Sequence, residues 1–115
     1  RMNWKEFMDE TEENLVSFSK EIPKTAKGFA SMGKAAKAGG VLDEKTKEFI
    51  ALGIAVATRC DSCIGFHIRS LINLKATRKE VCEALEMATY MGGGPSFAFS
   101  AKALKAYDQF IDLDK

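Results

Sequence analysis

Several residue types and sequence features are scarce in this chain, and each scarcity excludes a class of protein. Its 115 residues include 1 histidine, 3 cysteines and 2 prolines. The longest apolar run, from Phe49 to Ala57, is much shorter than the roughly 20 residues that cross a bilayer, so it indicates a buried helix segment. The opening RMNWKEF lacks the apolar stretch of a secretory signal. We therefore expect a cytoplasmic protein with no membrane partner.

An excess of one charge is also missing. The chain has 17 Lys and Arg residues against 16 Asp and Glu residues, and its pI is about 7.9. A nucleic-acid-binding surface needs a stripe of one sign and a higher pI, so we expect no nucleic-acid partner. One group of lysines has several glutamates close by in the chain, which is typical of a solvated helix face. These lysines are Lys24, Lys27, Lys34 and Lys37.

Apolar residues recur at helical spacing through almost the whole chain, and no strand alternation or internal repeat stands out. Thr77 with Glu80 has the pattern of a capping box, and Asp43 is a good N-cap. We expect an all-α bundle of about six helices that oligomerises, forming a single domain over residues 1–115. The predicted helices run from Asn3 to about Ile22, from Pro23 to Gly39-Gly40, from Asp43 onward, from near Cys60 to about Leu74, from Thr77 to the Gly92–Gly94 turn, and from Pro95 onward.

A glycine-rich turn, a pair of methionines and the third cysteine are each explained by structure, without a functional role. The glycines Gly92–Gly94 follow a helix and lack the spacing of a phosphate-binding loop, so they predict a helix C-cap and a sharp turn. Met87 and Met91 lie four positions apart on one helix face, which predicts core packing. Cys82 has no reactive residue pattern around it, which predicts core or interface packing.

The other two cysteines and the only histidine lie close together. On a helix, Cys60, Cys63 and His67 share one face within about 60°. Only a thiolate attacks, and an ordinary thiol with a pKa of about 8.5 is mostly protonated at neutral pH. Asp61 and Ser62 are helix-start residues that place Cys63 in the first turn, where free N–H groups, the helix dipole and His67 one turn later favour the anion. Cys63 is thus the predicted attacking thiol and Cys60 the disulfide partner, with the reverse assignment left open.

One acidic residue precedes this group on the preceding predicted helix. Taken alone, Glu48 is predicted to be an exposed first-turn acid, although a tight turn could bring it beside the cysteines. Together, Glu48, Cys60, Cys63 and His67 have the spacing E-x11-C-x2-C-x3-H. On this pattern the stretch from about Val41 to Phe110 resembles the alkylhydroperoxidase AhpD-like proteins of the carboxymuconolactone decarboxylase superfamily.

The resemblance implies a peroxiredoxin-type oxidoreductase that reduces hydroperoxides. Cys63 would become a sulfenic acid, Cys60 would donate a proton and then form the disulfide, and Glu48 with His67 would relay protons. The well-studied members have a histidine directly before the second cysteine, where this chain has Ser62. We therefore expect a shorter relay, with activity that is weak or directed at another hydroperoxide or disulfide.

The resemblance also indicates which molecules the protein interacts with. The resemblance implies a homo-oligomer, a trimer or a hexamer, and Trp4 and Phe7 are expected to be exposed, which favours self-association. The substrate is expected to be a small hydroperoxide and the electron donor a thiol or disulfide of unknown identity. We expect no cofactor and no metal.

Three other interpretations of the site stay open. Lactone decarboxylation occurs in the same superfamily, although that chemistry has no use for a cysteine pair. Cys60, Cys63 and His67 could also bind a metal with Glu48 as a fourth ligand, but no second pair of ligands exists elsewhere in the chain. Finally, the cysteines and the histidine could simply be buried for packing.

Overall fold

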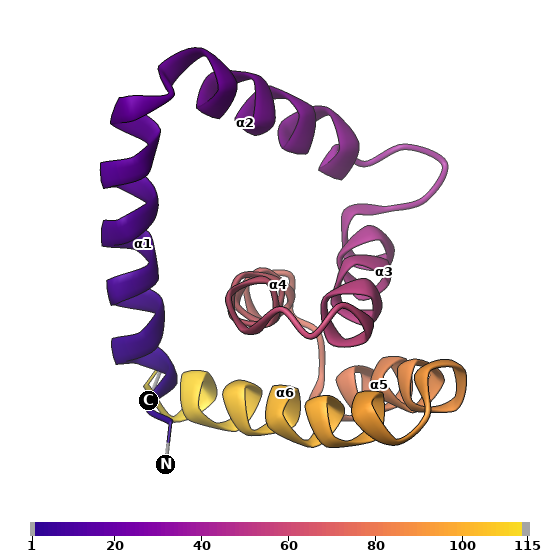
Figure 1. The fold of residues 1–115 in the computed structure, drawn as a ribbon. Helices are drawn as coiled ribbons and strands as arrows, with labels where there is room; N and C mark the ends of the chain where they lie inside the picture. The colour runs from indigo at the N-terminus through magenta and orange to yellow at the C-terminus, as the bar shows by residue number, and fades with distance from the viewer. Residues whose placement is uncertain (1, 114–115) are drawn as a thin grey trace.

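Six helices make up the fold of the described residues, as the sequence predicts (Figure 1). The computed structural model describes residues 2–113 and contains no strand within that range. The helices are α1 (Trp4–Glu21), α2 (Pro23–Lys37), α3 (Glu44–Ala57), α4 (Asp61–Asn73), α5 (Arg78–Gly92) and α6 (Gly94–Leu113). Within the described residues, none of them is long and apolar enough to cross a membrane.

Side-chain caps set where several helices begin. Asn3 accepts a hydrogen bond from the Glu6 N–H (3.0 Å) at the start of α1, and Asp43 accepts one from the Thr46 N–H (2.8 Å) at the start of α3. Each bond satisfies an N–H that the helix leaves without an internal partner. Gly93 ends α5 with a positive φ of 73°, which confirms the predicted C-cap and turn.

Helices α3, α4, α5 and α6 form the central bundle, in which every pair except α4 and α5 is in contact, and Trp4 and Met8 of α1 complete the core. Helix α1 packs on α4 and α6, whereas α2 contacts only α1 and α3 and buries none of its residues. Helices α1 and α2 are here called the arm. Figure 1 shows that they form a corner around α4. The fully buried large side chains are Trp4, Met8, Leu52, Ile64, Ile68, Leu71, Val56 and Val81.

A glycine on α4 allows α1 to approach. Gly65 is buried, and a Cβ built at this position would collide with the sulfur of Met8 on α1. The missing side chain therefore lets the backbone of α4 lie close to α1. Gly65 lies between Cys63 and His67 in the chain, so α1 contacts α4 at the level of these two residues.

Trp4 is not exposed, so that prediction is wrong. Its side chain is 1% exposed and packs edge-on against the partly buried ring of Phe7, with ring centroids 5.8 Å apart. The backbone N–H of Trp4 donates to Oε1 of Gln109 (2.8 Å), and Nε2 of Gln109 donates to the Met2 carbonyl (3.1 Å). These bonds tie the start of α1 to the end of α6 and carry the indole into the core.

The predicted core positions Met87 and Met91 are also wrong, because these side chains are 59% and 76% exposed. They line an open apolar groove of about 490 Å³ between α3 and α5, together with Ile50 and Ile54. Helix α3 is thus central, with Leu52 fully buried, yet one side of it faces outward. Much of the exposed apolar surface of the described residues lies on this groove and on the arm, and Trp4 does not contribute to it.

Candidate active site

A tight turn between α3 and α4 positions the two cysteines of the predicted site. Arg59 takes a left-handed conformation with φ 56°, and the Cys60 N–H donates to the Ala55 carbonyl (3.0 Å) while the Arg59 N–H donates to the Val56 carbonyl (3.1 Å). This pattern closes α3 in the manner of a Schellman cap. It makes Cys60 the N-cap of α4 and folds α4 back along α3.

Cys60 and Cys63 form a disulfide across the first turn of α4, with Cα atoms 5.2 Å apart. Cys63 lies in that first turn, as predicted, and its N–H points at Sγ of Cys60 (3.2 Å). The Ser62 hydroxyl lies 3.5 Å from the same sulfur, and it is the donor because a disulfide sulfur carries no hydrogen. Cys82 is free and half-buried on α5.

Glu48 and His67 join α3 to α4 beside this disulfide. The imidazole Nδ1 lies 2.6 Å from Oε2 of Glu48, and an ionised carboxylate only accepts, so the ring donates the hydrogen. Glu48 is 5% exposed, whereas the His67 side chain is 26% exposed. The prediction of an exposed first-turn acid is wrong, because α3 begins at Glu44 and Glu48 lies in its second turn, facing α4.

The sequence did not point to an ion pair at the other side of the cysteines. Nζ of Lys102 on α6 donates to Oδ2 of Asp61, the first residue of α4, at 2.9 Å. Oδ1 of Asp61 is buried and has no hydrogen-bond partner among the described residues. The two residues are 41 positions apart, so no spacing in the sequence could have linked them.

The structure therefore brings the predicted residues together as two bonded pairs, with His67 one turn after Cys63 on α4. A disulfide and its two thiols differ by two electrons and two protons. A histidine held by a buried carboxylate keeps Nε2 available to accept or give a proton. The arrangement can thus carry out thiol–disulfide chemistry with a proton-transfer group alongside.

A metal ion needs an arrangement of several ligating side chains around it. No group of three or more His, Cys, Asp or Glu side chains within residues 2–113 is placed to hold a metal ion. The two sulfurs are bonded to each other, and only a thiolate is a good metal ligand.

Fold and site together define a small all-α protein with a cysteine pair at a helix start. Residues 23–106 match the carboxymuconolactone decarboxylase family, and the chain belongs to this family. The resemblance to the superfamily that includes the AhpD-like proteins is thereby confirmed.

Solved structures of this family and a curated protein are similar to this chain. The structure of lpg0406, a carboxymuconolactone decarboxylase family protein from Legionella pneumophila, matches with a TM-score of 0.90 and 47% identity over 93% of this chain and 96% of that one. TM1620 from Thermotoga maritima, a family protein for which involvement in an antioxidative response has been suggested, matches with a TM-score of 0.73 and 29% identity over 78% and 93%. An uncharacterized protein of Haemophilus influenzae is 38% identical over 91% of this chain and 93% of its own length.

Proposed function

We propose that the protein is a thiol-dependent antioxidant enzyme that reduces hydroperoxides with Cys60 and Cys63. The observation that carries this proposal is the disulfide across the first turn of α4, one turn from a histidine bonded to a buried glutamate. The suggested antioxidative role of the Thermotoga relative supports the same chemistry.

The reaction takes two steps. The Cys63 thiolate attacks the terminal peroxide oxygen, the O–O bond breaks, and an alcohol and a Cys63 sulfenic acid form. The Cys60 thiol then attacks the sulfenic sulfur, which forms the disulfide and releases water. In the first step the leaving alkoxide needs a proton, and we assign that transfer to His67, with Glu48 holding the ring.

Counting thiols tests the assignment. The reduced protein has 3 thiols, and we expect cumene hydroperoxide to remove the two at Cys60 and Cys63 while Cys82 stays free. The rate should fall by orders of magnitude in Cys63→Ser, because the attacking atom is lost. Cys60→Ser should still consume one peroxide and stop at the sulfenic acid.

Cys82→Ser is the matched control, since it removes the cysteine that lies apart from the pair. We expect wild-type peroxide reduction from it. Unchanged peroxide reduction in Cys63→Ser would show the assignment to be wrong, and lactone decarboxylation that survives complete thiol alkylation would favour the other activity of the superfamily.

We also propose that the chain works as a homo-oligomer, a trimer or a hexamer, in the reducing cytoplasm. Two exposed apolar surfaces support self-association. One is the groove between α3 and α5, and the other is the arm, where Phe18 and Phe29 are 60% and 71% exposed.

A further inference from the structure

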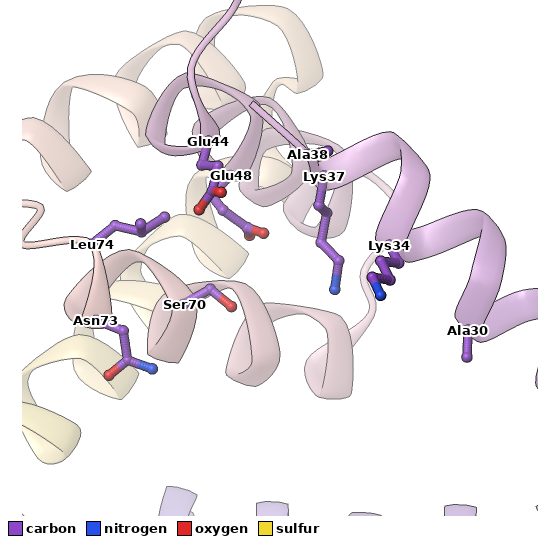
Figure 2. A pocket seen from close by; sticks show the side chains of 9 residues that line it. All are labelled: Ala30, Lys34, Lys37, Ala38, Glu44, Glu48, Ser70, Asn73 and Leu74. Carbon is purple, nitrogen blue, oxygen red and sulfur yellow. The ribbon is translucent and has the colours of Figure 1, made fainter. Parts of the chain in front are cut away.

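An open pocket of about 560 Å³, here called the cavity, lies beneath α2 where the arm faces α3 and α4, and its lining mixes charged, polar and apolar side chains (Figure 2). Its volume is in the range of pockets that bind small molecules. The polar side chains that line it are Lys34, Lys37, Glu44, Glu48, Ser70 and Asn73. Glu48 belongs to the active site described above, so this cavity adjoins that site directly.

Opposite charges line opposite walls of this cavity. Lys34 and Lys37 extend from α2, and Figure 2 shows Glu44 and Glu48 on the other side, on α3. Neither lysine ammonium makes an ion pair or hydrogen bond with any described residue, and α2 contains no acidic residue. The two cations are therefore available to a ligand.

Lys47 on α3 fixes the position of the cationic wall. Its Nζ donates to the carbonyls of Ala36 (3.0 Å) and Ala38 (2.6 Å) at the end of α2. Carbonyls at a helix C-terminus have no partner inside the helix, and a lysine there satisfies them. The end of the arm is thus tied to the helix that carries Glu48.

The cavity and the disulfide lie along one face of α4. Cys63, His67 and Ser70 follow each other at spacings of four and three residues, which places them on one stripe. At a rise of about 1.5 Å per residue, Ser70 lies about 10 Å along the helix from Cys63. A molecule held in the cavity can therefore reach toward the disulfide past His67.

We propose that this cavity binds the electron donor, and that the donor is a peptide-type thiol carrying both a carboxylate and an ammonium group. The inference rests on the proposed function, since it names the reductant of the same disulfide. The carboxylate pairs with Lys34 and Lys37, and the ammonium pairs with Glu44. A span of about 10 Å corresponds to about three residues of extended peptide.

The reduction balances with two donor molecules. The first donor thiolate attacks the disulfide, forms a mixed disulfide with one cysteine and leaves the other as a thiolate, which takes up the proton that the donor lost. The second donor attacks the mixed disulfide, so that one donor disulfide and two cysteine thiols result. Two electrons and two protons pass from the donors to Cys60 and Cys63.

Binding is tested without any turnover. The probe is S-methylglutathione, whose thiol is blocked, titrated into the oxidised protein and followed by amide chemical shifts. We expect the shifts to centre on residues 34, 37, 70 and 73, and the double variant Lys34→Gln/Lys37→Gln to bind at least about tenfold more weakly. The double variant Lys24→Gln/Lys27→Gln is the matched control on the same helix, outside the cavity, and should bind as the wild type does.

A kinetic experiment then tests the role as donor. Glutathione and the uncharged 2-mercaptoethanol each reduce the disulfide, and we expect the ratio of their rates to fall about tenfold in Lys34→Gln/Lys37→Gln and to stay unchanged in the control variant. Equal binding in both double variants, or an unchanged rate ratio, would overturn the inference. A failure of the oxidised cysteines to form with hydroperoxide would instead contradict the proposed function, and the binding titration would still decide the cavity.

Discussion

Glu48 shows how one buried side chain can organise a site. Its carboxylate is almost completely removed from water and lies 2.6 Å from a single imidazole nitrogen. A buried carboxylate needs such a partner, because the transfer of an unpaired charge from water is costly. The same bond fixes which nitrogen of His67 carries the hydrogen and leaves the other for proton transfer.

Replacing Glu48 with Gln tests this role. The amide oxygen of Gln can still accept the hydrogen from Nδ1, but the negative charge that supports a protonated ring is lost. We expect hydroperoxide reduction to fall about a hundredfold, and the free energy of unfolding to fall by about 1–3 kcal/mol as the charge-assisted bond weakens. Steady-state rates at several pH values and urea unfolding measure the two effects.

Glu83→Gln serves as the control for Glu48→Gln, because Glu83 is an exposed acid on α5 that does not line the site. It should change neither the rate nor the stability by a measurable amount. If Glu48→Gln has the wild-type rate over the whole pH range, Glu48 takes no part in proton transfer.

Residues differ in how well the sequence predicts their surroundings. The first-turn position of Cys63 was predictable, because local helix-start residues determine it. The burial of Glu48 and Trp4 was not, because it depends on which helix faces which, and the Asp61–Lys102 pair likewise joins residues far apart in the chain. The sequence thus predicts features that depend on neighbouring residues in the chain, but it does not predict contacts between residues on different helices.

At the scale of elements, the start of α5 combines a capping box with a link to α3. The Thr77 N–H donates to Oε1 of Glu80 (2.9 Å), the Glu80 N–H donates to the Thr77 hydroxyl (3.1 Å), and Nζ of Lys45 lies 2.8 Å from Oε2 of Glu80. The Lys45 ammonium, followed by the Thr77 N–H, holds the pKa of Glu80 below its ordinary value of 4.5. The stabilisation therefore requires the ionised carboxylate.

This lowered pKa predicts a loss of stability in acid. A carboxyl group with a lower pKa in the folded state binds fewer protons than in the unfolded state, so it stabilises the fold above its unfolded pKa. That contribution should disappear as the pH falls from about 4.5 through the lower folded value. Urea unfolding between neutral pH and pH 3 should show a weaker pH dependence in Glu80→Gln than in the wild type.

Glu86→Gln is the comparison for Glu80→Gln, since Glu86 is exposed farther along α5 and makes no ion pair in the described structure. It should retain the wild-type pH dependence of unfolding. Equal slopes for the wild type and Glu80→Gln would show that the capping box contributes nothing that depends on charge.

The sequence predicted where the helices begin and end better than it predicted what surrounds them. Capping residues such as Asp43 and Thr77 act within one turn, so they mark helix starts locally. The pocket beneath α2 could not be predicted, because it depends on the angle at which α2 leaves α1 and on the bonds from Lys47. Lys24, Lys27, Lys34 and Lys37 are exposed, as a solvated helix face requires, and two of them, Lys34 and Lys37, also line this pocket.

At the scale of the whole molecule, two apolar surfaces lack a covering element within the described chain. Helix α2 has 15 residues and buries none of them, and an isolated helix of that length is only marginally stable in water. The groove between α3 and α5 is open and lined by Ile54, Met87 and Met91. A net charge of +1 gives little repulsion between copies of the chain.

Introducing charge into the groove should therefore dissociate the homo-oligomer that we propose. We expect the double variant Ile54→Glu/Met87→Glu to have a lower mass by size-exclusion chromatography with light scattering, because two buried carboxylates without partners oppose association. Its helix content by circular dichroism should stay at the wild-type level, since both side chains are 59% exposed in the single chain. Lys79→Glu is the control, because it places a glutamate on an exposed site of α5 outside the groove and should leave the mass unchanged. An unaltered mass in the double variant would show that this groove is not the contact between copies, and the exposed apolar face of the arm would then be the surface to change.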